Sequence, residues 1–468
     1  MMLAAIAALA IVTQDQAALR AAPKDSAAQQ AVLWQGDTLE IRGERLDYLQ
    51  VYDHRRERAG FVRSSQVRQV DTQPADAPAL LSVVRFLRET PGAETLGIAY
   101  TAAYLKAAPA GAINAEPFAA LGSFADRLAR QATSRQAKAN DAVLAAHLEV
   151  AASYGVNLQS FERDGRIQLC YDGEAFRRVM ALAGTATEHA DAALALTRDD
   201  CIDPALPQLA RHQLDQWRAE VLDRVPTDTL PAYLKNRLLL RRASVTASLA
   251  FQAARHGETT VGLAAQSIAA LAGVNKTELT DEDLGSYNDA AIRVGASRWG
   301  LVPAATTRPG LGIVTSPGQP GETCVSLVDA HHDAKAPLIS RCTYGVAWVA
   351  SAAPNPQGSA LALAVQPLES WRELWVFRRI GEQWTVDVLT PNTHDTTLGY
   401  IEFAGWVPGG GQLLTTTETR TEGRYKRTFT VLNADSLNVD KQADRPESIN
   451  AFYRWQDAAW KRETVSLR

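Results

Sequence analysis

Short apolar and polar segments separated by charged turns fill residues 17–70, and their spacing restricts this region to an all-β fold. Residues 47–52 and 58–62 have the pattern of two short strands joined by an arginine-rich turn. Gly60 marks the point where the second of these strands is expected to bend. The N-terminal region is therefore predicted to form a small all-β module.

Length and charge limit what the rest of the chain can be. At 468 residues the chain is too long for a single core, so we expect several domains. The apolar content of 46% and the charged content of 21% are typical of a folded soluble protein. The formal net charge of −4 supplies no basic field, which argues against bulk binding of nucleic acid.

An apolar run at residues 3–12 is too short to cross a bilayer as a helix, so we expect no stable membrane span from it. Its length suits the apolar part of a secretory signal, with Ala8 and Ala10 as small residues for cleavage. We predict a signal segment at residues 1–13 and a periplasmic or secreted protein. The alternative is a buried N-terminal segment, because no Lys or Arg precedes the run.

Three segments of the N-terminal module carry a family resemblance. Residues 19–23 are similar to the opening strand and turn of bacterial SH3-like (SH3b) domains. Residues 34–44 resemble the glycine-containing turn and next strand, and residues 47–52 and 59–62 resemble the last strands. The resemblance implies an SH3-like β-barrel over residues 14–72.

Members of this family bind cell-wall peptides or peptidoglycan, or act as targeting modules beside other domains. The resemblance therefore implies an envelope location and a binding task. The aromatic candidates for lining a groove are Trp34, Tyr48, Tyr52 and Phe61. Tyr48 and Tyr52 are four residues apart, so on a strand they point to the same face. The alternative is that the aromatics form the core of the module, above all Phe61, which lies in an apolar strand.

A proline-containing segment at residues 73–78 lacks apolar bulk and predicts a linker. Residues 79–300 then carry repeated helix signals, which predict an all-α helical array. Thr185 and Glu188 have the capping-box spacing, and Thr280 precedes a helix expected to run to residue 296. No consensus recurs at a fixed period, so we favour an irregular array over a repeat solenoid.

Two further patterns in the helical region predict how one helix begins and packs. Asp203 followed by Pro204 matches a helix cap with proline at the first helical position. Leu214, Trp217 and Val221 then repeat at helical spacing, which predicts one buried face.

The four cysteines form two local pairs, Cys170 with Cys201 and Cys324 with Cys342. We predict a disulfide in each pair, since an exported chain meets an oxidising compartment, and each bridge would contribute roughly 3 kcal/mol. The first bridge would clamp an antiparallel helical hairpin, because Cys170 precedes one predicted helix and Cys201 follows the next. Free buried thiols are the alternative; a metal site is disfavoured because the chain contains no Cys-x-x-Cys.

From about residue 301 the composition changes to Gly, Pro, Thr, Val and Trp, and a strand–turn–strand order recurs. Residues 404–410 resemble the strand and turn of propeller blades of the TolB type, and residues 373–377 resemble their inner strands. The resemblance implies an antiparallel β domain with blade-like sheets over residues 301–468. Two units and a partial one at residues 451–466 are too few for a closed propeller.

No catalytic constellation emerges from the sequence. His331, His332 and Asp333 form the one cluster that suggests a metal or a general base. Neighbouring residues on a strand point to opposite faces, so we favour a solvated loop there. No Gly-x-Ser-x-Gly occurs, and the glycine runs lack the context of a phosphate loop. We therefore assign no catalytic residue, metal ligand or cofactor.

The sequence as a whole predicts a multidomain α+β protein of the cell envelope. We expect a non-enzymatic binding or scaffold protein that uses its SH3-like module to contact peptidoglycan peptides or an envelope protein. The rival hypothesis is a cell-wall hydrolase that the same module targets to its substrate. A third possibility is a helical scaffold whose module packs inward and binds nothing.

Overall fold

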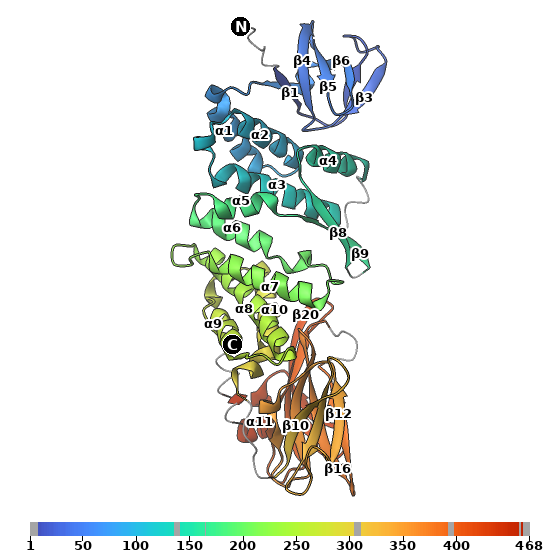
Figure 1. Cartoon of the computed structure of the whole chain (residues 1–468), viewed down its shortest axis with the longest axis vertical. Helices are drawn as coiled ribbons and strands as arrows, with labels where there is room; N and C mark the ends of the chain where they lie inside the picture. The colour runs from blue at the N-terminus through green and yellow to red at the C-terminus, as the bar shows by residue number, and fades with distance from the viewer. Residues whose placement is uncertain are drawn as a thin grey trace. The chain divides into compact units, whose positions relative to one another are not determined.

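A computed structural model describes residues 8–134, 141–163, 165–303, 310–391, 397–457 and 460–461 (Figure 1). The chain divides into two compact units. The first unit comprises Met1–Pro207 and Arg224–Leu230, and the second comprises Gln208–Asp223 and Pro231–Arg468. The division falls inside the helical region predicted at 79–300 and not at either of its ends. Among the described residues, no helix combines the length and the hydropathy needed to span a membrane.

The first unit begins with a seven-stranded antiparallel sheet in the order β3-β2-β6-β5-β4-β1-β7. The strands are β1 (Leu9–Val12), β2 (Ala17–Arg20), β3 (Gln29–Leu33), β4 (Thr38–Arg45), β5 (Tyr48–Asp53), β6 (Arg58–Arg63) and β7 (Val67–Val70). The all-β prediction for this region is confirmed. The expected closed barrel is not found, because β3 and β7 lie at opposite ends of the described sheet and do not pair with each other.

Gly60, predicted to mark a bend, lies inside β6 where that strand passes close to β2. A Cβ atom at this position would come within 2.7 Å of the Leu19 side chain and 2.9 Å of the Arg20 carbonyl oxygen. The glycine is therefore required by the close approach of two strands.

Strand β1 lies within the predicted signal segment. It pairs with β4 on one side and with β7 on the other. Ala10, Ile11 and Val12 are no more than 2% exposed. Residues 9–12 of the predicted signal segment therefore form a buried strand of the sheet, and the prediction of a signal at 1–13 stays a prediction. Residues 1–7 of the predicted signal lie outside the described part of the chain.

Six helices and a hairpin follow in the first unit. They are α1 (Ala77–Arg88), α2 (Glu94–Ala107), α3 (Ala115–Thr133), α4 (Asp141–Ser153), β8 (Leu158–Arg163), β9 (Arg166–Tyr171), α5 (Glu174–Ala181) and α6 (Ala186–Leu196). The hairpin β8–β9 was not expected in a region predicted to be all α. The predicted linker at 73–78 is already structured, because Gln73 and Asp76 form a capping box around a 3-10 turn and α1 begins at Ala77.

One apolar cluster joins the sheet to these helices. Ile11 of β1 and Val70 of β7 pack in the same core as Val84 of α1 and Phe124 of α3. The β3–β4 turn also lies close to α2, since a Cβ on Gly36 would come within 2.6 Å of the Thr95 carbonyl oxygen. The N-terminal sheet is therefore part of the first unit's core and not an appended module.

Local signals in the helical region are partly confirmed. The Thr185 hydroxyl accepts from the Glu188 backbone N–H at 3.1 Å, and the Glu188 carboxylate accepts from the Thr185 backbone N–H at 2.7 Å. The Cys170–Cys201 bridge joins β9 to the 3-10 turn after α6, so it closes around the α5–α6 pair as predicted. Asp203 and Pro204 do not start a helix; they form a turn, and α7 begins at Gln208.

The described part of the second unit begins with the helices α7 (Gln208–Asp223), α8 (Ala232–Arg255), α9 (Val261–Ala272) and α10 (Asp281–Ser297). Thr280 caps α10 by accepting from the Asp283 backbone N–H at 3.2 Å, as expected. The predicted buried face of α7 is wrong in part. Leu214 and Trp217 are only partly buried.

The core-facing side of α7 instead carries an ion pair. Asp215 and Arg218 are 0% and 1% exposed, and Arg218 Nη1 donates to Asp215 Oδ1 at 2.7 Å. Ser248 and Gln252 of α8 each donate to Asp215 Oδ2 at 2.8 Å. The buried side of α7 thus includes a hydrogen-bonded ion pair, which the spacing of the apolar residues does not predict.

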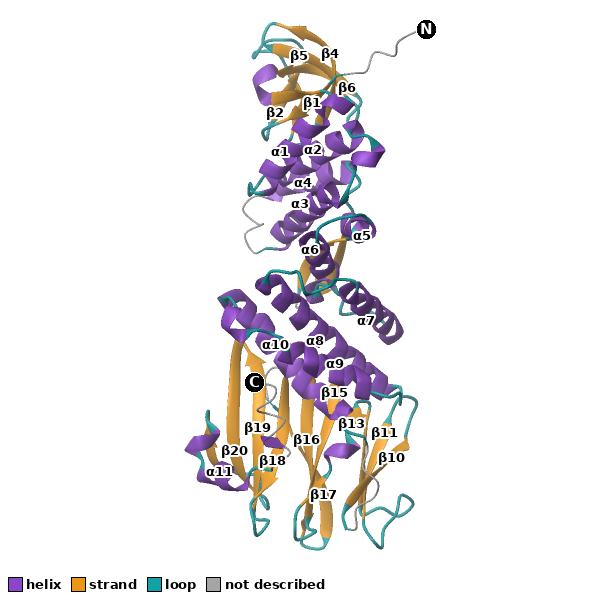
Figure 2. Ribbon diagram, turned by 90° about the vertical axis from the view of Figure 1, so that its left-hand side faces the viewer, coloured by secondary structure: helices purple, strands orange, loops and turns teal. Residues whose placement is uncertain are grey.

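Two sheets complete the second unit (Figure 2). A three-stranded sheet contains β10 (Gly312–Pro317), β11 (Thr323–Val328) and β12 (Ile339–Thr343). A nine-stranded sheet contains β13 (Val346–Ala347), β14 (Ala353–Pro354), β15 (Ala360–Leu368), β16 (Trp371–Ile380), β17 (Gln383–Leu389), β18 (Gly399–Trp406), β19 (Gln412–Thr421), β20 (Arg424–Asn433) and β21 (Val439–Ala443). The two expected blade-like units share this one sheet, because β16 and β18 pair in parallel. The partial unit predicted at 451–466 begins with a helix, α11 (Asn450–Trp455), and its residues 458–459 and 462–466 lie outside the described part of the chain.

A buried ionic cluster fixes α10 to the larger sheet. Arg298, in the 3-10 turn that follows α10, donates through Nε to Glu402 of β18 at 3.0 Å, and Trp299 Nε1 donates to the same carboxylate at 3.1 Å. Arg372 of β16 pairs with Glu402 and also donates to the Gly295 carbonyl oxygen at 2.8 Å. Burial alone would raise the pKa of Glu402, but the two arginines hold it below its ordinary value of 4.5.

We expect Ile11→Ala to weaken the first unit by about 2–5 kcal/mol, because it removes buried methyl groups from the core shared by sheet and helices. Hydrogen exchange of the β4 and β7 amides would report the loss of protection. Val32→Ala on β3 is the control, since Val32 is 37% exposed and its truncation should change stability by less than about 0.5 kcal/mol. Equal effects of the two substitutions would contradict the placement of β1.

Glu402→Gln should destabilise the second unit by about 3–5 kcal/mol in thermal unfolding at neutral pH, because it removes the negative charge that lies between the buried guanidinium groups of Arg298 and Arg372. The lowered pKa means that Glu402 contributes stability above its ordinary pKa of 4.5 and loses it as pH falls through the folded value. The difference between wild type and variant should therefore shrink in acid. A double variant, Arg372→Met with Glu402→Leu, should cost less than the single change.

Candidate functional site

Strand alternation places three of the four predicted aromatic residues on one face of the N-terminal sheet. Within β5, Leu49 and Val51 point into the core, so Tyr48 and Tyr52 point to the opposite face. The β5–β6 register pairs Gln50 with Phe61 and Tyr48 with Arg63, which adds β6 residues to that face. We call the set Tyr48, Gln50, Tyr52, Phe61 and Arg63 the aromatic face.

Tyr48 is held in place by two charged neighbours. Its hydroxyl donates to Asp25 Oδ1 at 2.6 Å, and the Arg63 guanidinium lies 5.2 Å from its ring centroid. Arg63 Nε also donates to Asp25 Oδ1 at 2.9 Å, and Arg63 Nη1 donates to Asp47 at 2.6 Å. The hydrogen bond from Arg63, followed by that from Tyr48, lowers the pKa of Asp25 from 3.8 to about 2. Tyr48 is only 2% exposed, so it supports the face more than it offers contact area.

Tyr52 is the better contact residue, since it is partly exposed. The Arg42 guanidinium lies 4.2 Å from its ring centroid, and the His54 ring meets it edge-on at 4.9 Å. Glu40 links these two neighbours, with His54 Nε2 at 2.6 Å and Arg42 Nε at 3.3 Å. The hydrogen bond with His54 is the largest cause that lowers the pKa of Glu40, and the hydrogen bond with Arg42 is the next largest. At this position a guanidinium group can bind a ligand carboxylate, and the partly exposed ring can contact an apolar group of the same ligand.

Phe61 and Trp34 differ in their placement. Phe61 lies on the aromatic face opposite Gln50 and is partly exposed, so the core alternative does not describe it fully. Trp34 follows β3 at the edge of the sheet, and its backbone N–H donates to Asp37 Oδ2 at 2.9 Å. It does not belong to the aromatic face as defined by strand register.

Sequence reasoning missed the charged members of this site. Arg63 is two residues after Phe61, so the alternation that selected the aromatics would also have placed Arg63 on their face. Arg42 lies next to a register shift between Ile41 and Gly43, which breaks simple alternation in β4. No local signal connects Asp25 to Arg63, because the two are far apart in the chain.

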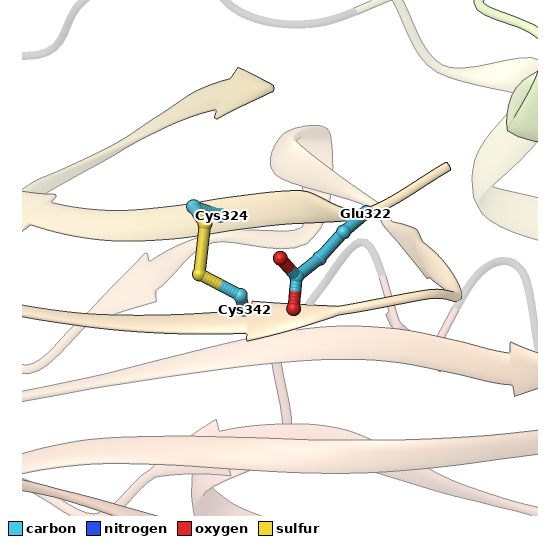
Figure 3. Close-up of side chains that lie close together, drawn as sticks. All are labelled: Glu322, Cys324 and Cys342. Atoms are coloured by element: carbon cyan, nitrogen blue, oxygen red, sulfur yellow. A yellow bond between two sulfur atoms is a disulfide. The ribbon is translucent and has the colours of Figure 1, made fainter. Parts of the chain in front are cut away.

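The second predicted disulfide also forms. Cys324 of β11 and Cys342 of β12 stand directly opposite each other in the register and are bonded. Glu322 lies beside them, and the three residues are the one His/Cys/Asp/Glu group of metal-binding size among the described residues (Figure 3). Both sulfur atoms are engaged in the disulfide, so this oxidised form presents no thiolate. His331 and His332 lie in an exposed turn with Asp329, as expected for a solvated loop.

Removal of the Arg63 charge should release the Asp25 carboxyl. In Arg63→Gln we expect the pKa of Asp25 to rise from about 2 toward 3.8, because its largest stabilising contact is lost. Carboxyl-detected NMR titration of the full chain measures this directly. Arg85→Gln, which breaks an exposed pair with Glu116 in the same unit, should leave Asp25 unchanged. An Asp25 pKa near 3.8 in the wild type would contradict the described contacts.

Comparison of the chain with protein-family models, with curated proteins and with solved structures finds no match. The likeness to bacterial SH3-like domains therefore stands on the sequence segments that carry it. The same holds for the likeness to TolB-type blades.

Proposed function

We propose that this chain is a non-enzymatic binding protein of the cell envelope whose aromatic face contacts the peptides of peptidoglycan. The observation that carries the proposal is the grouping of Tyr52, Phe61 and Arg63 on the aromatic face, with the Arg42 guanidinium beside the Tyr52 ring. Peptides of the cell wall present free carboxylates beside small apolar side chains. A face of aromatic rings and guanidinium groups is complementary to that chemistry.

The cation of the aromatic face, Arg63, and the neighbouring cation Arg42 are both accessible to a ligand. The Arg63 and Arg42 side chains are 38% and 46% exposed, although each already has an acidic neighbour. A ligand carboxylate would share these donors, since one guanidinium offers five N–H groups. The face thus offers charge-assisted hydrogen bonds without burying an unpaired cation.

The two disulfides support an envelope location. All four cysteines of the chain are bridged. Such bridges persist in oxidising compartments such as the periplasm and the cell exterior, and are rare in the cytosol. The sequence likeness of residues 14–72 to SH3-like domains supports the same location independently of the disulfides, because that family serves in cell-wall recognition.

Binding to purified cell-wall sacculi tests the proposal. We expect the full chain to sediment with sacculi, and Tyr52→Ala and Phe61→Ala each to weaken binding by about tenfold, as for an aromatic contact residue. Phe86→Ala is the matched control, because Phe86 is an exposed aromatic of α1 in the same unit and lies off the face. Circular dichroism would verify that all three variants fold.

The same assay separates the rival functions. Sedimentation without a fall in sacculus turbidity supports a binding protein, whereas clearing of the suspension would support a cell-wall hydrolase. If Tyr52→Ala and Phe61→Ala both sedimented with sacculi as well as the wild type, the role of the aromatic face would be refuted. Failure of the wild-type chain to sediment would favour a protein partner over peptidoglycan.

A further inference from the structure

The Cys324–Cys342 bridge lies at the surface, next to a carboxylate that takes no part in it. Cys342 is exposed, while Cys324 and Glu322 are partly buried. A thiol reductant can therefore reach the sulfur atoms, and accessible bridges are the ones most readily reduced. Reduction would leave two thiols on neighbouring strands beside the carboxylate of Glu322.

Strand geometry keeps the three donor groups together. Glu322 precedes Cys324 by two residues, so both side chains lie on the same face of the chain. Cys342 stands opposite Cys324 in the β11–β12 register. One donor atom from each of the three residues lies within 4.8 Å of the other two, and Figure 3 shows the carboxyl group beside the bridge.

The β10–β11 turn positions the carboxylate. Glu322 Oε2 accepts from the Gln319 backbone N–H at 3.0 Å, and the Gly318 backbone N–H donates to the Glu322 carbonyl oxygen at 3.0 Å. A Cβ on Gly318 would lie 2.5 Å from Glu322 Oε2 and 2.9 Å from Cys324 Sγ. A larger residue at position 318 would therefore have to displace the carboxylate or the sulfur atom.

We propose that the reduced chain binds a thiophilic divalent cation, most suitably Zn²⁺, through Cys324, Cys342 and Glu322. Two thiolates and one carboxylate are a donor set that zinc accepts in a tetrahedral site, with water in the fourth position. The Glu322 carboxylate keeps lone pairs for an ion, because the Gln319 N–H uses only one of its acceptor positions. The inference does not depend on the proposed function.

The chemistry balances in two steps. Two molecules of a thiol reductant transfer two electrons and two protons to the bridge, which gives two cysteine thiols and one molecule of oxidised reductant. Binding of the cation then releases both thiol protons to solvent. The oxidised chain has no thiolates to bind the cation, so only the reduced chain is expected to bind it.

Titration with Co²⁺, a spectroscopic substitute for Zn²⁺, tests the proposal. The assay uses the full chain with Cys170→Ser and Cys201→Ser, so that only the second pair can respond. After reduction we expect one equivalent of Co²⁺ to produce thiolate charge-transfer and tetrahedral ligand-field bands, and the oxidised chain to produce neither. Zn²⁺ should displace the cobalt and raise the melting temperature of the reduced chain alone.

Variants assign the ligands. Glu322→Gln should weaken Co²⁺ binding by at least about tenfold, because it removes a ligand. Loss of a residue that only hydrogen-bonds to a metal ligand already weakens metal binding by about tenfold or more. Glu382→Gln, at an exposed acid in the turn between β16 and β17, should leave the affinity unchanged. Absence of the bands in the reduced chain, or their persistence in Cys324→Ser with Cys342→Ser, would overturn the proposal. A Glu322→Gln variant with wild-type affinity would do the same. The zinc-dependent rise in melting temperature shows whether the reduced chain is folded.

Discussion

A carboxylate buried between two guanidinium groups determines how the second unit is put together. Glu402 sits on β18, Arg372 on β16 and Arg298 directly after α10, so one charge holds two strands and a helix. Removing these groups from water is costly, and the cost is offset only when every partner is in place. The parallel pairing of β16 with β18 brings Arg372 and Glu402 within reach, and a slip of one residue would turn one of them to the other face. The cluster therefore ties the register of the large sheet to the position of α10.

Apolar packing holds the N-terminal sheet of the first unit to its helices. Strand β1 lies between β4 and β7, and Ile11 contributes to the same core as α1 and α3. Burial of one side of the sheet fixes which residues face outward. Burial of Leu49 and Val51 therefore determines the aromatic face, because neighbouring residues of a strand point to opposite sides and Tyr52 must point away from the core.

Features that depend on nearby residues could be predicted from the sequence, and features that depend on distant partners could not. The capping box at Thr185 and the bridge around α5 and α6 arise from short-range spacing, and both were found. The buried pair of Asp215 and Arg218 was missed, because hydrophobic periodicity treats every charge as solvent-facing. In the candidate site, strand alternation grouped Tyr48 with Tyr52, but the contact of Asp25 with Arg63 joins segments that no local pattern relates.

The bridge between Cys170 and Cys201 has a consequence for proteolysis. The connection between α5 and α6 is exposed at residues 183–185 and lies within the loop that the bridge closes. A protease that cut there would leave two pieces still linked through sulfur, with β9 attached to the turn after α6. The nicked chain would run as a single species until reduced, so an intact band on a non-reducing gel is no proof of an uncut backbone.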